Sequence, residues 1–366
     1  MSPRSAATAL AVPEDVRLVP GAERVVNPDP SHYMTCRQRQ ILAYLLAVDP
    51  WAGLLKYAAL ESTAEIYHHC VIRRQARWTF EPRLGADDDL EALGHPVRHL
   101  GDGALDDLPR VLEFLAAGQP VLFYAPSGDV PYFAEYLRGR GKIDTDALAR
   151  HSVLLAGVSP DATRFVALDI ANPELRFVPE IISWEQIVTG HAAHPGGWFL
   201  DATTIGHRPG PPDAGELMER YRRLLSESRE GFEIYGQLPD VVTADRAAGT
   251  GVDTAPSLDS LRMLAGSRTL FHQFLLGTTH HPSVVHAYHR VARLLRHQVT
   301  QVAAHLTGQT EVRKPHLRRE LTAIAAEESA AFRRLRADLA HGPITFHPFA
   351  RPFARPSVSA PSEGRP

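Results

Sequence analysis

Cysteine is scarce in this sequence: its 366 residues include only two, Cys36 and Cys70. Two cysteines cannot build a framework of disulfides, and a structural zinc site would have to draw mostly on histidine. The length suggests two or three domains, since a domain commonly holds about 100–200 residues. Each of the two sulfurs therefore needs its own explanation.

A surplus of charge is missing too. The formal net charge is -3, so no basic excess exists to neutralise a nucleic-acid backbone or to seek an anionic membrane. No uncharged apolar stretch approaches the ~20 residues of a membrane span. Charged residues such as Glu14, Asp15 and Arg17 interrupt any signal-peptide run near the N-terminus. We expect a soluble, cytoplasmic protein without nucleic-acid or membrane partners.

Helix and strand signals alternate from about Cys36 to Thr203. Helical spacing of apolar residues and short apolar runs bounded by Gly, Pro or Asp predict the two kinds of element. The expected helices are 36–48, 51–70 and 108–115, and the expected strands are 121–124, 152–158, 164–168, 175–178 and 198–200. Helices followed by a run of strands predict an α+β domain and not alternating βαβ units.

A proline-rich stretch at 209–212 reads as a linker to a second, helical half. Apolar periodicity predicts its helices, and the segment 236–256, poor in large apolar side chains, is expected to be a loop. The predicted helices are 213–227, 257–276, 282–307 and 315–340. The expected domains are a disordered or extended N-terminus at 1–24, an α+β domain at 25–205, a linker at 206–212, a helical domain at 213–341 and a disordered tail at 342–366.

Cys36 stands where the first strong helix begins. A helix N-terminus presents unpaired N–H groups and a partial positive charge, both of which favour thiolate over thiol. The thiolate is the nucleophilic form of cysteine. Taken alone, Cys36 is better explained as a buried structural cysteine in a helix.

A histidine and an aspartate further along the chain give Cys36 its context. His151 begins an apolar strand, and after a turn the next strand ends at Asp169. A short hairpin returns the end of its second strand to the start of its first. Asp169 can therefore approach His151 and fix its tautomer, as the third member of a catalytic triad does. The predicted catalytic residues are Cys36, His151 and Asp169.

This order of cysteine helix, histidine strand and aspartate strand resembles the papain-like cysteine fold. More narrowly, the chain resembles the butirosin-biosynthesis acyltransferase family, which pairs such a domain with a helical C-terminal domain. The likeness extends over about residues 30–340 and rests on the segments 36–46, 118–122, 131–133, 151–157, 166–169, 271–275 and 321–328.

The resemblance implies acyl transfer from a carrier-protein thioester to an amine in the synthesis of an antibiotic-like metabolite. Cys36 would attack the thioester, His151 would move protons, and Asp169 would orient the imidazole. The implied partners are an acyl carrier protein and a small-molecule amine acceptor. No cofactor or metal is expected, apart from phosphopantetheine carried by the partner protein.

The surroundings of the cysteine depart from the family pattern. The family usually has His directly before its cysteine, where this sequence has Thr35 after His32-Tyr33-Met34. The backbone N–H of Cys36 would supply one oxyanion donor. For a second donor, His32, Gln38 and Gln40 lie within sequence reach.

Other interpretations stay open. The same triad would make a thioesterase, amidase or peptidase if water resolves the acyl-enzyme, and a fold without chemistry would be a scaffold. Cys70, after His68 and His69, is the alternative nucleophile. Glu65 and His69 share a helix face, as two metal ligands would, but a packed helix end is the default interpretation. Histidines at 280, 281, 286 and 289 form another cluster, for which we expect solvated or core-edge roles. No P-loop or dinucleotide fingerprint occurs.

Overall fold

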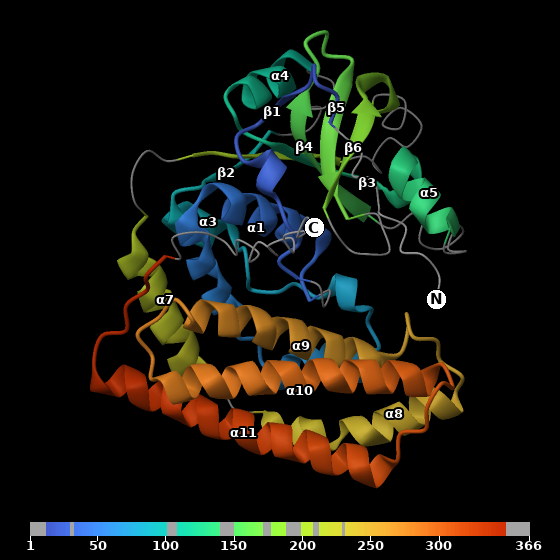
Figure 1. The fold of residues 1–366 in the computed structure, drawn as a ribbon, viewed down its shortest axis with the longest axis vertical. Helices are drawn as coiled ribbons and strands as arrows, with labels where there is room; N and C mark the ends of the chain where they lie inside the picture. Colours follow the sequence, from blue (N-terminus) through green and yellow to red (C-terminus); the bar gives the residue numbers. More distant parts are fainter. Residues whose placement is uncertain are drawn as a thin grey trace, which may run out of the picture.

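The computed structural model describes residues 12–29, 33–100, 108–139, 150–170, 177–187, 199–207, 212–228 and 231–348. A sheet with its flanking helices forms one side of the molecule, and a layer of long helices forms the other (Figure 1). Helix α1 (Cys36–Val48) lies between the two. Among the described residues, no helix combines the length and apolar character needed to cross a membrane.

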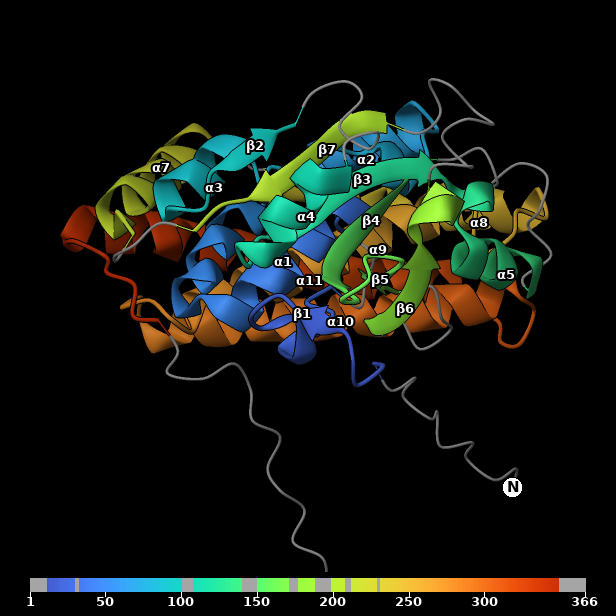
Figure 2. The same ribbon diagram turned by 90° about the horizontal axis from the view of Figure 1, so that it is seen from above.

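The sheet is antiparallel throughout its described pairings. Six strands follow the order β2-β7-β3-β4-β5-β6, and β1 pairs with β4. Figure 2 shows β3, β4 and β5 side by side, with β1 near the end of β4. The strands are β1 (Arg17–Leu18), β2 (Val97–His99), β3 (Val121–Pro126), β4 (Arg150–Val158), β5 (Arg164–Asp169), β6 (Val178–Ser183) and β7 (Phe199–Ile205). This antiparallel sheet, accompanied by many helices, confirms the predicted α+β class, and the narrower papain-like assignment stays a prediction.

Strand β4 lies in the interior of the sheet, between β3 and β5. Its central residues are apolar on both faces. Residues Val153 to Ala156 are fully buried although their side chains alternate between the two faces. Helices α1 and α4 (Leu108–Ala116) both contact this strand. The predicted strands 121–124, 152–158 and 164–168 fall within β3, β4 and β5.

Two predicted strands begin outside the described residues. The segment predicted at 175–178 reaches them only at its end, where β6 starts at Val178. The strand predicted at 198–200 is longer than expected, because β7 runs on to Ile205. Helix α5 (Pro131–Gly139) follows β3 after a 3₁₀ turn, η6 (Ser127–Asp129).

The prediction of one helix over 51–70 is wrong. The segment divides into a 3₁₀ helix η2 (Pro50–Ala59), a short α2 (Thr63–Tyr67) and a π-helical turn η3 (His68–Ile72). The break occurs because the carbonyls of Ala59 and Glu61 accept hydrogen bonds from Ser267 and Arg268. Ser62 then caps α2 by accepting from the Glu65 N–H. Tertiary hydrogen bonds thus replace the helical ones.

Four long helices confirm the periodicity of the second half. These are α7 (Ala214–Glu227), α9 (Pro256–Leu275), α10 (Pro282–Leu306) and α11 (Lys314–His341). Helix α9 is buried nearly all round because it packs against η2 on one side and α10 on the other. One continuous core contains residues of both halves, and the proposed division into domains stays a prediction.

The expectation of a loop over 236–256 is wrong, because α8 (Leu238–Ala247) lies within it. Helix α8 adds few large apolar side chains to the core: Leu238 and Val242, one turn apart, are buried. Helix α8 also contacts α9, α10 and α11, so packing against neighbours stabilises a helix whose own pattern is sparse.

Both chain ends make specific contacts where they are described, which is compatible with the extended N-terminus expected at 1–24 and differs from the disorder expected after residue 342. Arg17–Leu18, inside the segment 1–24, form β1 and pair with β4. After Gly342, Phe346 is buried, bridges to Thr278 and stacks on Phe274 with ring centroids 5.9 Å apart. The repeated segment beyond residue 348 lies outside the described residues. The remaining short elements are η1 (Ala22–Arg24), η4 (Arg77–Thr79), α3 (Asp87–Leu93) and η7 (Phe232–Gly236).

Candidate active site around Cys36

Cys36 is the first residue of α1, as the sequence predicts. Thr35 caps the helix, since its side chain accepts from the Gln38 N–H while the Gln38 side chain accepts from the Thr35 N–H. Thr35 therefore has a structural reason to stand before the cysteine. The thiol is free and only partly exposed.

The backbone before Cys36 is held by buried hydrogen bonds. The Met34 N–H donates to Asp29 Oδ2 at 2.6 Å, and Arg39 donates to the Met34 carbonyl. The Tyr33 hydroxyl donates to Glu61 Oε1 at 2.7 Å. These contacts restrict where the first turn of α1 can place the sulfur.

The sheet register brings His151 and Asp169 together. Leu154 pairs with Leu168 across β4 and β5, which sets Asp169 opposite Val153. His151 lies two residues before Val153 in β4, so its side chain is on the same face of the sheet as that of Val153. This makes His151 a diagonal neighbour of Asp169. His151 Nε2 lies 2.5 Å from Asp169 Oδ2, and the two residues are only 6% and 1% exposed. The predicted histidine–aspartate contact is present.

Helix α5 covers this pair. The Tyr132 hydroxyl donates to Asp169 Oδ2 at 3.0 Å, and the Ile170 N–H donates to Asp169 Oδ1 at 2.7 Å. The ring of Phe133 stacks on His151 with centroids 3.9 Å apart. The carboxylate thus has donors on both oxygens, and the imidazole is fixed in its plane.

The electrostatics favour a charged cysteine–histidine pair. Burial raises the pKa of the Cys36 thiol. The hydrogen bond with His151, the charge of His151 and hydrogen bonds from Ser152 have the opposite effect, and the resulting pKa is about 7. Burial lowers the pKa of His151, but the Asp169 carboxylate and the hydrogen bonds to Asp169 and Cys36 raise it to about 10. Between these values thiolate and imidazolium coexist. Because Nε2 serves Asp169, Nδ1 is the ring nitrogen left for Cys36.

The two glutamines considered as oxyanion donors have other partners. Gln38 Nε2 donates to the Pro82 carbonyl at 2.8 Å. Gln40 Nε2 donates to the carbonyls of Ser152 and Leu168 at 2.8 and 3.5 Å. His32 lies outside the described residues. Both glutamines therefore act within the scaffold.

The other cysteine has none of these features. Cys70 is fully buried, and its sulfur lies 3.5 Å from the thioether of Met263. Burial and the Asp259 carboxylate raise the pKa of its thiol to about 12. A neutral, enclosed thiol of this kind is a packing residue, so Cys70 is not a plausible nucleophile.

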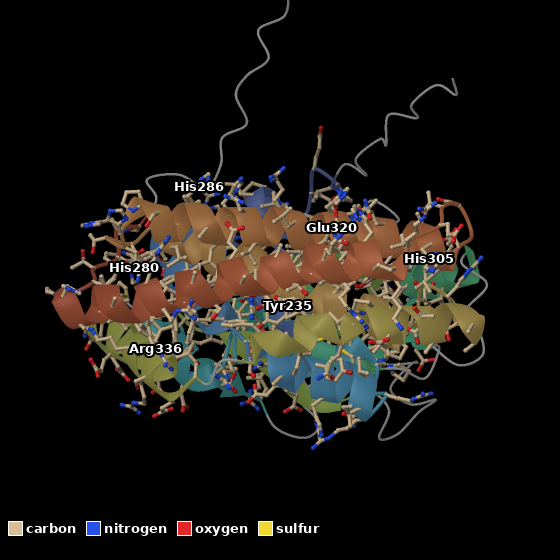
Figure 3. All side chains as sticks on the ribbon, turned by 90° about the horizontal axis from the view of Figure 1, so that it is seen from below. Tyr235, His280, His286, His305, Glu320 and Arg336 are labelled. Atoms are coloured by element: carbon tan, nitrogen blue, oxygen red, sulfur yellow. The ribbon has the colours of Figure 1, made fainter. Side chains whose placement is uncertain are left out.

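The histidine cluster of the second half has separate roles. His280 contacts Asp338 and the Tyr221 hydroxyl, while His281 caps α10. His286 and His289 are exposed. Figure 3 shows His280 and His286 apart, with His305 towards the far end of α10. Within the described residues, no group of three or more His, Cys, Asp or Glu side chains could hold a metal ion.

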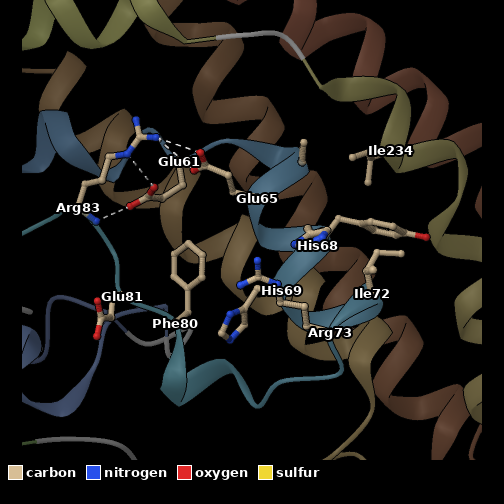
Figure 4. A pocket seen from close by; sticks show the side chains of 12 residues that line it. Glu61, Glu65, His68, His69, Ile72, Arg73, Phe80, Glu81, Arg83 and Ile234 are labelled. Atoms are coloured by element: carbon tan, nitrogen blue, oxygen red, sulfur yellow. Dashed lines mark hydrogen bonds and ion pairs between the residues drawn. The ribbon is translucent and has the colours of Figure 1, made fainter.

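A surface cavity of about 620 Å³ lies beside α2 and η3, lined by residues including Glu65, His69 and Arg83. Figure 4 shows the Arg83 guanidinium in contact with the carboxylates of both Glu61 and Glu65. The residues that line the cavity include none from α1, β4 or β5, so Cys36, His151 and Asp169 are not part of its wall.

Local sequence pattern indicates no role in the site for four of its contributors. Tyr132 and Phe133 stand out only through the family likeness, and Ser152 is one residue of an apolar strand. Gln40 is a candidate oxyanion donor by sequence distance but has a different role in the structure. The usable signal is periodicity: Gln40 is one turn after Cys36, so it faces the same side of α1.

A comparison with known proteins supports a distant relationship. No family model matches the chain. Over 67 residues it is 37% identical to the ribostamycin:4-(gamma-L-glutamylamino)-(S)-2-hydroxybutanoyl-[BtrI acyl-carrier protein] 4-(gamma-L-glutamylamino)-(S)-2-hydroxybutanoate transferase of Niallia circulans. The matched segment covers 18% of this chain and 22% of that protein. The similarity therefore concerns about a fifth of each molecule.

Proposed function

We propose that this protein is a cysteine acyltransferase that moves an acyl group from a carrier-protein thioester to an amine. The observation that carries the proposal is the arrangement of Cys36, His151 and Asp169. A thiol at a helix start is paired with a buried imidazole, and a carboxylate fixes the far side of that imidazole. This combination is suited to nucleophilic catalysis through a covalent intermediate.

The first half-reaction uses the ion pair as it stands. The Cys36 thiolate attacks the thioester carbonyl carbon, and the backbone N–H at the start of α1 stabilises the oxyanion. The carbon–sulfur bond to the carrier then breaks. The departing thiolate takes a proton from the His151 imidazolium, which leaves an acyl-enzyme and a neutral imidazole. Asp169 holds the ring through Nε2, so the exchange takes place at Nδ1.

The second half-reaction restores the ion pair. An amine attacks the acyl-enzyme, its proton passes to His151, and the Cys36 thiolate leaves as the amide forms. The relative from Niallia circulans supports this choice of reaction, since its name describes transfer of an acyl group between an acyl-carrier protein and ribostamycin. A natural-product or antibiotic pathway, with an amine-bearing acceptor, is the setting we propose.

Intact-mass spectrometry tests the first half-reaction. The full chain is incubated with a panel of acyl groups on phosphopantetheinylated carrier proteins. We expect a mass increase equal to the acyl group in the wild type and in Cys70→Ala, and none in Cys36→Ala. Absence of any adduct across the panel, in chains whose Cys36 is alkylated normally, would contradict the proposal.

The fate of the adduct separates transfer from hydrolysis. With an acyl-enzyme in hand, a panel of amines, including aminoglycosides, is added. Transfer predicts that a matching amine accelerates loss of the adduct and appears in an amide product. Loss at the same rate with and without amines, yielding free acid alone, would make the protein a hydrolase.

A further inference from the structure

Gln40 is a buried polar residue in the interface between α1 and the sheet. It lies one turn after Cys36 and is only 2% exposed. A leucine would fill such a position without any hydrogen-bonding requirement. A buried amide costs free energy unless its donors and acceptor all find partners, so its contacts show what it does there.

The partners of Gln40 adjoin both other members of the site. Its Nε2 donates to the carbonyl of Ser152, the residue after His151, at 2.8 Å. The same nitrogen reaches the carbonyl of Leu168, the residue before Asp169, at 3.5 Å. One side chain from the cysteine helix therefore connects to the histidine strand and to the aspartate strand.

The amide oxygen completes the set. The Ser152 hydroxyl, fully buried, donates to Gln40 Oε1 at 2.6 Å. With this bond the two N–H groups and the oxygen of Gln40 all have partners. A fully satisfied buried network of this kind defines one arrangement of the elements it joins.

We propose that Gln40 is a positioning residue that, with Ser152, locks α1 against β4 and β5 and so fixes Cys36 relative to His151. Apolar packing between a helix and a sheet tolerates small sliding motions, whereas the Gln40 contacts are directional. A shift of α1 along β4 would break the bonds to Ser152 and Leu168 together. The geometry thus ties the separation of sulfur and imidazole to one amide.

Ser152 extends this role to the sulfur itself. Hydrogen bonding by its side chain and by its backbone N–H lowers the pKa of the Cys36 thiol. The single hydroxyl proton is donated to Gln40 Oε1, so the backbone N–H is the donor that remains for the sulfur. Gln40 holds Ser152 by both its carbonyl and its hydroxyl, and thereby fixes the position of this N–H.

Alkylation of the thiol by iodoacetamide as a function of pH tests the proposal without any acyl donor. Gln40→Met keeps the shape of the side chain but removes every hydrogen bond, and Ser152→Ala removes only the hydroxyl. We expect both to raise the pH midpoint of Cys36 alkylation and to slow the reaction at pH 7. For Gln40→Met we expect about a fivefold slowing, because a one-unit rise from a pKa of about 7 lowers the thiolate fraction at pH 7 from about a half to about a tenth. Cys70→Ala serves as the background for all variants.

Gln298→Met is the matched control. Gln298 is also a buried glutamine, 1% exposed, but lies in α10 and donates to Glu320. Gln298→Met is expected to leave the alkylation profile of Cys36 unchanged, because Gln298 bonds to Glu320 on α11 and not to the sheet. If Gln40→Met and Ser152→Ala stay folded and keep the wild-type profile, the positioning role is overturned. If Gln40→Met fails to fold, Ser152→Ala alone decides in the same way.

The catalytic purpose of this positioning role rests on the proposed function, but the alkylation experiment that tests the role does not. A shifted alkylation profile with no acyl adduct from any donor would retain the positioning role and remove the acyltransferase. An acyl adduct with an unshifted alkylation profile would support the acyltransferase and remove the positioning role of Gln40.

Discussion

At the scale of single residues, the carboxylate of Asp169 decides the charge state of the site. It is 1% exposed, and it receives hydrogen bonds from Tyr132 and the Ile170 N–H besides its contact with His151. These donors give both oxygens of the buried carboxylate a hydrogen-bond partner. The charge in turn stabilises the imidazolium, and the imidazolium stabilises the Cys36 thiolate.

Removing the negative charge of Asp169 should lower the pKa of His151 and raise that of Cys36. In Asp169→Asn the pKa of His151 falls, because the nearby carboxylate is what raises it. A neutral imidazole supports the thiolate less, so the pKa of Cys36 rises from its value of about 7. We expect alkylation at pH 7 to slow about fivefold for a one-unit rise and more for a larger one, and the profile to move to higher pH.

The pH profile of iodoacetamide labelling, followed by mass spectrometry, measures this shift. In the wild type, reactivity should rise through pH 7 as the thiol ionises and stay high at higher pH, because the thiolate persists. Asp161→Asn is a suitable control, because Asp161 lies in the β4–β5 turn and bonds to Ser159. Equal profiles for Asp169→Asn and the wild type would exclude the charge relationship.

Among single residues, sequence reasoning found those whose chemistry is distinctive. Cysteine at a helix start, histidine at a strand start and aspartate at a strand end could each be read from local pattern. Gln40 and Ser152 could not, because a glutamine in a helix and a serine in a strand are ordinary. Only the packing of α1 on β4 gives these two residues a role.

At the scale of elements, Gly157 shows how a strand end is built. The β4–β5 register shifts between Leu155 and Gly157, and β1 pairs with Gly157 from the other side. A Cβ atom on Gly157 would lie 2.7 Å from a Leu18 methyl and 3.0 Å from the Arg17 carbonyl oxygen. The glycine six residues after His151 is therefore required by the approach of β1.

Gly157→Ala should destabilise the protein by about 1–3 kcal/mol, because overpacking forces backbone to move. Differential scanning calorimetry would show this as a lower melting temperature. The control is Gly236→Ala, at a position where a Cβ meets nothing within 4 Å, and it should be nearly neutral. An alanine tolerated at 157 without loss of stability would mean that β1 does not hold this position in solution.

Elements were predictable where their own pattern determines them. Helix α1 and the strands β3, β4 and β5 match their apolar periodicity. The structure of the segment 51–70 and of helix α8 was not predictable, because it depends on contacts with distant parts of the chain. Ser267 and Arg268 interrupt the segment 51–70 by donating hydrogen bonds to its backbone carbonyls. Neighbouring helices stabilise α8, which has few apolar residues of its own.

At the scale of the whole molecule, a buried ion pair connects the helical layer to the cysteine loop. Arg268 on α9 donates to Glu328 on α11 at 2.5 Å, and both side chains are almost completely buried. The same guanidinium donates to the Glu61 carbonyl, and the Glu61 carboxylate accepts the Tyr33 hydroxyl. The loop that leads into α1 is thus held from the far layer.

Glu328→Ala should destabilise the protein strongly, by about 3–5 kcal/mol, because it leaves the Arg268 guanidinium buried without its counter-charge. Chemical denaturation measures this. The double variant Arg268→Met with Glu328→Leu removes both charges and should recover much of the loss. Recovery should be incomplete, because Tyr235, which donates to Glu328, and the Glu61 carbonyl lose partners, at about 1–3 kcal/mol each. A double variant as unstable as Glu328→Ala would show that hydrogen bonding by Arg268, and not charge balance, holds the two layers together.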